Sequence, residues 1–223
     1  MGMEMFNLNS MKIGTRMLII VAGAILAALL VGAFGLTELR SNMLEDRKAK
    51  TKNLVESTIS LIGHFHAMEQ SGEMTTEQAQ NAAKAAVAAL RYDETNYFFV
   101  FDYTPVVLIH DIKKDLVGKN LSDAVDGSGK HHYREFARVA KEEGQGFVDY
   151  TYQVPKSDKL RPKLSFVKAF KPWGWVVATG IYIDDVNAVF MQSMLVMGLV
   201  ALAVLCAVVG VSLMISRGIT RPL

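Results

Sequence analysis

The sequence predicts an α+β domain of about 150 residues between two membrane-spanning helices. Two long apolar runs lie near the two ends of the chain. Apolar residues recur at helical spacing after the first run, and a period of two replaces that spacing after Tyr92. The first pattern is typical of an amphipathic helix, and the second of strands with one buried face.

The first apolar run extends from Met17 to Leu36 and contains no charged residue, proline or amide. At about 1.5 Å per residue it spans roughly 30 Å, the thickness of a bilayer's hydrocarbon core. The alternatives are a buried helix of a soluble protein and a cleaved signal peptide. The run is longer than either usually is, and no clear small-x-small cleavage site follows it. The sequence therefore favours a retained membrane helix.

The second apolar run, Ala188 to Ile215, contains one amide and no charge. Cations flank the outer ends of both runs, at Lys12, Arg16, Arg217 and Arg221. Because Lys and Arg are enriched on the cytoplasmic side of membrane helices, both ends of the chain are predicted to be cytoplasmic. We therefore expect a cytoplasmic N-terminus at 1–16, membrane helices at 17–36 and 188–215, and an exported domain at 37–187.

The exported segment contains 20 of the 24 Lys and Arg residues and 21 of the 22 Asp and Glu residues. Its net charge of about −1 argues against nucleic acid as a partner. The single cysteine, Cys206, lies in the second apolar run, so no disulfide is expected in the exported domain. A segment of this length is long enough to be stable through its core alone.

The first half of the exported segment is predicted to be helical. Helical spacing runs without proline from Thr37 to Gln70, and Ser71-Gly72 ends it. A second helix is expected to start near Thr75, because Thr75 and Gln78 have capping-box spacing, and to continue to Leu90.

The second half is predicted to form a five-stranded antiparallel sheet. Asp184 and Asp185 then favour a helix N-terminus that runs into the second apolar run. A ligand-dependent shift in the sheet would be transmitted through this final helix. The expected strands are Tyr97 to Phe101, Val106 to His110, Phe147 to Val154, Lys163 to Phe170 and Trp175 to Tyr182; turns lie at 102–105 and 171–174, a polar loop at 111–130 and a short helix at 131–142.

The sequence contains no strong motif for catalysis or for metal binding. His131-His132 with Glu135 superficially suggests metal-binding spacing on a helix, but a complete set of ligands is not evident. There is no nucleophile elbow, P-loop or Cys-His pair. We therefore expect no catalytic activity, no metal and no cofactor.

Several motifs in order resemble the single-Cache sensor domain of bacterial chemoreceptors, over nearly the whole exported segment. The start, Met11-Lys12-Ile13-Gly14-Thr15-Arg16-Met17, looks like that of a methyl-accepting chemotaxis protein, and Arg217-Gly218-Ile219-Thr220-Arg221-Pro222-Leu223 looks like the opening of a HAMP linker (216–223). The sensor motifs are Leu90-Arg91-Tyr92, Tyr97-Phe98-Phe99-Val100, Leu108-Ile109-His110, Leu116 to Leu121, Gly146-Phe147-Val148, Lys163 to Lys168 and Trp173 to Asp185.

The resemblance implies a PAS-like sheet with a long N-terminal helix across its back. It also implies a homodimer in the bacterial inner membrane and a small-molecule pocket between the sheet and the loop-and-helix segment. Its signal would pass to a cytoplasmic signalling module with its kinase and adaptor. Members of this family commonly bind short carboxylates such as acetate, propionate, lactate, pyruvate or formate. Two departures are Phe166, where tyrosine is common, and Asp111, where proline is frequent.

Lys168 is the cation that we expect to anchor a carboxylate. It lies in an otherwise apolar strand, and an inward ammonium would need an anion. Spacing alone favours a solvent-facing edge lysine, and the resemblance reverses that preference. His110, at the start of the loop, is either a surface histidine or a donor in the pocket.

Aromatic residues provide the other candidates. Tyr97, Phe99 and Phe101 share one face of their strand and Phe98 and Val100 the other, and the sequence does not decide which face meets the pocket. We expect Phe99 to form an apolar wall. Tyr133, Tyr150 and Tyr152 are candidate hydroxyl donors or plain core residues, and Arg91 either clamps the carboxylate or, as we favour, caps a helix.

The leading functional hypothesis is a chemoreceptor sensor region. The alternative is the same sensor joined to a histidine kinase or a nucleotide cyclase. A third possibility, a stalk or adhesin without ligand, would be favoured by a pocket that lacks any inward charge.

Overall fold

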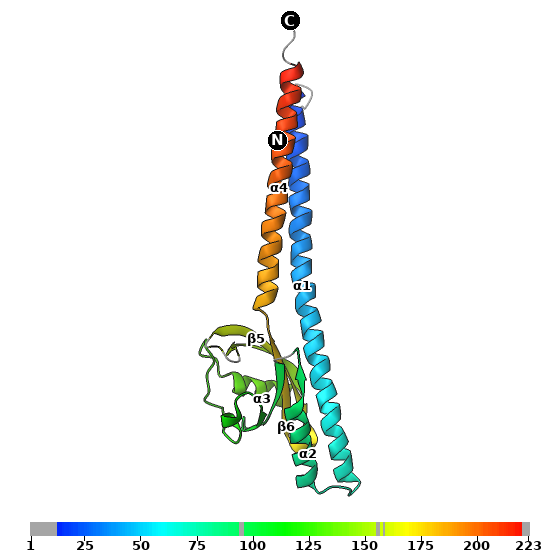
Figure 1. Ribbon diagram of the computed structural model, residues 1–223, viewed down its shortest axis with the longest axis vertical. Helices are drawn as coiled ribbons and strands as arrows, with labels where there is room; N and C mark the ends of the chain where they lie inside the picture. The colour runs from blue at the N-terminus through cyan, green and yellow to red at the C-terminus, as the bar shows by residue number, and fades with distance from the viewer. Residues whose placement is uncertain (1–12, 94–95, 155–156, 158, 220–223) are drawn as a thin grey trace, which may run out of the picture. The chain divides into compact units, whose positions relative to one another are not determined.

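The computed structural model describes residues 13–93, 96–154, 157 and 159–219, and it divides the chain into two compact units (Figure 1). One unit comprises Met1–Asn42 and Val186–Leu223, and the other is Met43–Asp185. The predicted cytoplasmic N-terminus (1–16) and HAMP opening (216–223) lie partly outside the described residues. Their assignment therefore stays a prediction.

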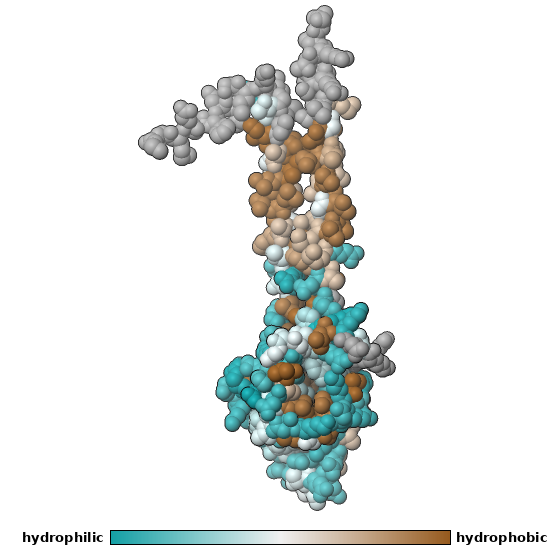
Figure 2. All heavy atoms as spheres, turned by 90° about the vertical axis from the view of Figure 1, so that its left-hand side faces the viewer, coloured by the Kyte–Doolittle hydropathy of each residue, from teal (hydrophilic) through white to brown (hydrophobic). Residues whose placement is uncertain are grey.

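The first unit is a pair of apolar helix segments that lie side by side. They belong to α1 (Ile13–Gln70) and α4 (Asp184–Ile219), and Arg40 donates a 3.1 Å hydrogen bond from one to Asn187 of the other. Both helices are long and apolar enough to cross a membrane, and none of the residues in their most apolar windows is buried. Figure 2 shows the apolar side chains gathered over this unit. They coincide with the two apolar runs that the sequence analysis identified.

The second unit begins with the polar half of α1 and continues into α2 (Thr76–Ala89). Thr75 and Gln78 form the predicted capping box: the Thr75 hydroxyl accepts from the Gln78 amide at 3.2 Å, and the Gln78 side chain accepts from the Thr75 amide at 2.9 Å. Between the helices Gly72 has a φ of +80°, a left-handed conformation that suits glycine at a helix C-terminus. The two predicted helices are therefore confirmed.

A fully antiparallel sheet follows, and it contains the five predicted strands and a two-residue strand that the sequence did not predict. The order is β1-β2-β6-β5-β4, with β3 also paired to β2. The elements are β1 (Arg91–Tyr92), β2 (Asn96–Asp102), β3 (Val107–His110), η2 (Lys114–Leu116), α3 (His132–Glu142), β4 (Gln145–Gln153), β5 (Leu160–Phe170), η3 (Lys171–Trp173) and β6 (Trp175–Tyr182).

Each face of the sheet packs against its own hydrophobic cluster. Tyr97, Phe99 and Phe101 lie in the cluster that α3 covers, whereas Phe98 and Val100 lie in the cluster that contains residues of α1 and α2. The period of two along β2 thus sends aromatic rings into both layers. The α3 side is the side on which the polar loop also lies.

One carboxylate, that of Asp126, helps to tie the loop between β3 and α3 to the sheet. Oδ1 of Asp126 accepts hydrogen bonds from the Ser128 amide, the Ser128 hydroxyl and the Lys130 amide, each at 2.7–2.8 Å. Its Oδ2 accepts from the Thr151 amide of β4 at 2.7 Å. Burial raises the pKa of this carboxyl, but the four hydrogen bonds outweigh burial and hold the pKa well below its ordinary value.

Candidate functional site

An aromatic cavity lies between the sheet and α3. Its empty volume is about 170 Å³, divided into gaps too narrow for a water molecule. A ligand therefore enters only if lining side chains or the loop move apart. The lining residues are Tyr97, Phe99, His110, His132, Tyr133, Phe136, Tyr150 and Tyr152.

The backbone register explains how distant strands build this cavity. Tyr150 of β4 pairs with Lys163 of β5, and Lys163 pairs with Tyr182 of β6. Gly180 of β6 lies beside them, on the face of the sheet that bounds the cavity; this face is called the floor. A Cβ atom at position 180 would lie 2.9 Å from the Leu164 carbonyl oxygen and 3.1 Å from Cε of Lys163, so the absence of a side chain leaves room for the lysine. Glycine at position 180 is what lets the lysine side chain lie across the sheet.

Lys163 is a buried cation, with 2% of its surface exposed. Its Nζ lies 5.0 Å from the ring centroid of Tyr97, 5.2 Å from that of Tyr152 and 5.1 Å from that of Tyr182. These distances suit cation–π interactions, which replace only part of the lost hydration. Among the described residues, none forms an ion pair with Lys163. Burial therefore lowers its pKa to about 7.

Lys113, from the loop, brings a second ammonium to the edge of the cavity. Its Nζ lies 4.9 Å from the Tyr152 ring centroid and donates a 3.3 Å hydrogen bond to Oε1 of Gln153. The charge of Lys113 also contributes to the lowered pKa of Lys163. The described cavity thus has two cations beside it and no carboxylate among its lining residues.

His110 is 2% exposed and lies between aromatic rings, 5.0 Å from Tyr97 and 6.0 Å from Phe99 between centroids. Its Nδ1 accepts a 3.0 Å hydrogen bond from the Lys113 amide. The neutral ring therefore has its proton on Nε2, where it is available as a donor. Burial lowers the pKa of His110 to about 4, so the ring is neutral near pH 7.

His132, the first residue of α3, is 4% exposed. Its ring lies parallel to that of Tyr150, with centroids 5.2 Å apart and planes 5° apart. Neither ring nitrogen has a hydrogen-bond partner within the described structure. Burial lowers the pKa of His132 to about 4.

The tyrosines supply hydroxyl groups that stay protonated. Burial raises the pKa of Tyr152 to about 12, and it also raises the pKa of Tyr97, Tyr133 and Tyr150 well above the ordinary value. The Tyr150 hydroxyl lies 3.0 Å from Oγ of Ser165, a fully buried residue of β5. An apolar, water-poor chamber with a buried cation and protonated hydroxyls is suited to binding a small anion.

The prediction that Lys168 points into the pocket is wrong. Its Nζ forms a 2.9 Å ion pair with Oε1 of Glu56 on α1, and it shares that sheet face with Phe166 and Phe170. Lys163 and Lys168 are five residues apart in one strand, so they point to opposite faces. The lysine beside the aromatic cavity is Lys163, whose Nζ lies near the rings of Tyr97 and Tyr152.

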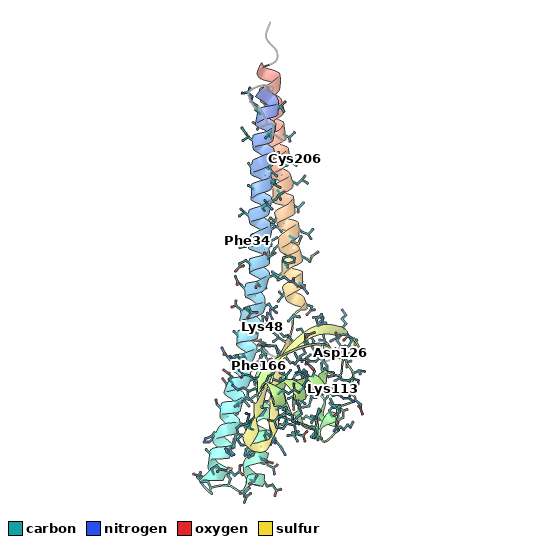
Figure 3. The ribbon with its side chains drawn as sticks, turned by 180° about the vertical axis from the view of Figure 1, so that it is seen from behind. Phe34, Lys48, Lys113, Asp126, Phe166 and Cys206 are labelled. Carbon is teal, nitrogen blue, oxygen red and sulfur yellow. The ribbon has the colours of Figure 1, made fainter. Side chains whose placement is uncertain are left out.

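Two further residues lie away from the cavity. Phe166, one of the two departures from the family pattern, lies against Phe147 on the α1 side, so the missing tyrosine hydroxyl does not affect the cavity. Figure 3 shows Phe166 next to α1, with Lys113 and Asp126 on the loop side of the sheet. Arg91 does not line the cavity: its Nη1 donates to the carbonyls of Ala88 and Leu90, as the capping alternative predicts, and its Nη2 pairs with Asp111.

The structure brings the other predicted residues together around one cavity, namely His110, Phe99, Tyr152, Tyr133, Tyr150 and Tyr97. Sequence reasoning missed Lys163, Lys113 and His132. Strand alternation places Lys163 and Lys168 on opposite faces of β5, but only the pairing of Lys163 with Tyr150 shows which face meets the cavity. His132 was considered only as a metal ligand, and in the described part of the chain no group of three or more His, Cys, Asp or Glu residues is arranged to hold a metal ion.

Comparison with known proteins identifies relatives of this chain. Methyl-accepting chemotaxis protein McpP of Pseudomonas putida is 30% identical over 219 residues, covering 98% of this chain and 40% of McpP. Sensor histidine kinase MctS of Rhizobium johnstonii is 34% identical over 147 residues, covering 66% of this chain and 31% of MctS. The chain therefore spans well under half the length of these curated relatives.

Two solved structures share the fold of the second unit. A periplasmic sensor domain of a chemotaxis protein is 42% identical with a TM-score of 0.62, covering 63% of this chain and 98% of that one. A Cache chemosensory domain, described in connection with carboxylic acid recognition, is 29% identical with a TM-score of 0.61, covering 64% of this chain and 97% of that one. The Single Cache domain 2 family matches residues 43–195, which is more than half of the sequence, and the chain belongs to that family.

Proposed function

We propose that this chain is the sensor region of a transmembrane chemoreceptor and that its aromatic cavity binds a short carboxylate. The observation that carries the proposal is the buried ammonium of Lys163, which has three tyrosine rings around it and no ion-pair partner among the described residues. An anionic ligand supplies the counter-charge that this lysine lacks. A stalk without ligand gives no reason for such a group.

Each cavity residue has a proposed role. Lys163 anchors the carboxylate and Lys113 adds positive potential at the edge. His110 donates from Nε2, because its Nδ1 already accepts the Lys113 amide. Phe99 provides an apolar wall, and Tyr97, Tyr133, Tyr150 and Tyr152 provide ring surface and hydroxyl donors.

A small cavity that must open to admit a ligand favours a compact acid. The best very small ligands gain about 1.5 kcal/mol per non-hydrogen atom, so an acetate-sized ligand gains roughly 6 kcal/mol. That gain corresponds to a Kd of tens of micromolar at best, on the order of 10⁻⁵ M. Acids of two to four carbons, such as acetate, propionate, lactate or pyruvate, are the proposed ligands.

The signal is proposed to leave the domain through β6. Ala178 and Gly180 of this strand form the floor beneath the aromatic rings, and two residues after Tyr182 the chain enters α4. A carboxylate that moves Lys163 therefore acts close to the start of α4. The receptor is proposed to be a homodimer in the inner membrane, with both apolar helices crossing the bilayer and the domain on the outer side.

The output is proposed to be chemotaxis, through a HAMP linker and a cytoplasmic module that acts on a kinase and its adaptor. The relationship to McpP over nearly the whole chain favours this output. The relationship to MctS favours the second candidate, the sensor region of a membrane histidine kinase. The coding sequence beyond position 223 would separate them: an uninterrupted heptad pattern predicts a chemoreceptor, and a catalytic kinase domain the alternative.

The binding proposal is tested with the 223-residue chain in lipid nanodiscs. We expect calorimetry to detect micromolar binding of at least one two-to-four-carbon acid, and we expect that acid to raise the unfolding temperature by mass action. The matched variants are Lys163→Met, which should lose binding, and Lys168→Met, which should retain it. Absence of heat and of thermal stabilisation with every such acid would contradict the proposal.

A further inference from the structure

His132 has a property that carboxylate anchoring does not use. Its imidazole is 4% exposed, and both Nδ1 and Nε2 lack a hydrogen-bond partner within the described structure. A buried polar group without a partner is costly, and such groups are few in native proteins. This ring is held in place by stacking on Tyr150, with planes 5° apart, and by an edge contact with Phe136. It is therefore fixed in position with its polar atoms unused.

The position of His132 relative to the proposed anchor defines what it can reach. Its ring centroid lies 6.0 Å from the Tyr152 centroid, and Nζ of Lys163 lies 5.2 Å from the same centroid. The imidazole and the ammonium thus both lie beside the same tyrosine ring at the aromatic cavity.

We propose that His132 is a specificity-determining residue that recognises a hydroxyl or oxo group next to the ligand's carboxylate, so that the site prefers 2-hydroxy and 2-oxo acids to unsubstituted acids of the same length. This inference rests on the proposed carboxylate site. Lys163 takes the carboxylate, which leaves the ring nitrogens of His132 for a second polar atom. A neutral imidazole accepts from a hydroxyl at one nitrogen and donates to an oxo group at the other.

The physical basis is that a ligand can either form a hydrogen bond with the buried nitrogen of His132 or only shield that nitrogen from water. Propionate would place a methylene where His132 needs a partner, and the ring nitrogen would stay unpaired. Lactate or pyruvate would pair it. Sites built to hydrogen-bond a ligand group discriminate strongly against analogues without that group, and here we expect a preference of about tenfold or more.

The test compares matched acids on the full chain in nanodiscs. Wild-type protein should bind lactate or pyruvate at least about tenfold more tightly than propionate, and glycolate more tightly than acetate. His132→Phe keeps a ring on Tyr150 but removes both nitrogens, so the ratio should fall to about one while propionate still binds. The control is His131→Phe at the exposed neighbouring histidine, which should keep the wild-type ratio.

The outcomes separate this inference from the proposed function. If wild-type protein binds substituted and unsubstituted acids equally, or if His132→Phe keeps the preference, the role of His132 is overturned while the carboxylate site stands. If no acid binds, both fall. Should His132→Phe fail to fold, wild-type protein with ¹⁵N-labelled histidine decides: both acids should shift the imidazole nitrogen resonances of one buried histidine, His110, and lactate but not propionate should shift those of a second, His132. Identical spectra with both acids would overturn the inference.

Discussion

Nζ of Lys163 lies 5.1 Å from the ring centroid of Tyr182, directly across the β5–β6 register. The pocket's buried cation and the last residue of β6 are therefore neighbours. The Tyr182 hydroxyl in turn donates a 2.7 Å hydrogen bond to the Gln153 carbonyl at the end of β4. A change in the charge or position of Lys163 thus acts on the strand that leads to α4.

Replacing Lys163 with methionine should separate binding from folding. Removing a buried charge that lacks an ion-pair partner should leave the free energy of unfolding unchanged or raise it, because the desolvation cost disappears. Ligand binding should weaken by about 2 kcal/mol or more, the scale of a hydrogen bond to a charged group. Calorimetry and urea unfolding measure the two effects. A variant that binds as tightly as wild type would remove Lys163 from the site.

The stability of the domain should rise with pH in two windows. His110 and His132 have pKa values lowered from 6.5 to about 4, so the unfolded chain binds more protons between these values and stability is lost as pH falls from about 6.5 to 4. Lys163 has a pKa lowered from 10.5 to about 7, so its contribution increases as pH rises from about 7 to 10.5. Urea unfolding at several pH values measures both, and in Lys163→Met the upper rise should shrink.

Ligand affinity should change in the opposite direction in the upper window. A bound carboxylate favours the charged ammonium of Lys163, so binding near pH 8 should take up a proton and should weaken as pH increases. Calorimetry in buffers of different ionisation enthalpy detects that uptake as a buffer-dependent heat. Equal heats in all buffers would mean that Lys163 is already fully charged in the free protein.

Asp126→Ala should destabilise the loop between β3 and α3. The change removes the acceptors of four hydrogen bonds, three within the loop and one from the Thr151 amide. Loss of charged acceptors of this kind typically costs about 3 kcal/mol. Hydrogen exchange should become faster at the Ser128, Lys130 and Thr151 amides. Unchanged protection at these amides would show that the loop is held by other contacts. Asp123→Ala, at an exposed carboxylate in the same loop, is the matched control.

Gly180→Ala should disrupt the pocket floor. The added Cβ would collide with the Ser165 hydroxyl and with the Leu164 carbonyl oxygen, and it would press on Cε of Lys163. We expect a loss of about 2 kcal/mol or more in unfolding free energy together with weaker ligand binding. Gly63→Ala in α1 is the control, because nothing lies within 4 Å of its added Cβ and alanine favours a helix. Equal behaviour of the two variants would contradict the proposed floor.

The sequence predicted the fold well because its signals are local. The capping box at Thr75, the hairpin between β2 and β3 and the glycine turn at Gly174 depend on residues a few positions apart. The site was harder to predict, because alternation defines two faces of β5 without saying which one meets α1. Choosing the wrong face exchanged Lys163 for Lys168. For His132, the missing information was its burial and unpaired nitrogens, which only tertiary packing decides.

The floor of the cavity has a mechanical consequence. On the pocket side of β6 the positions before Tyr182 are Ala178 and Gly180, and the strand is hydrogen-bonded to β2 on one side and β5 on the other. A large side chain there could absorb a push by rotating about its own bonds. Alanine and glycine have no such bonds to rotate. A ligand that presses on this part of β6 would therefore displace the main chain, and the hydrogen-bonded strands β2 and β5 would move with it.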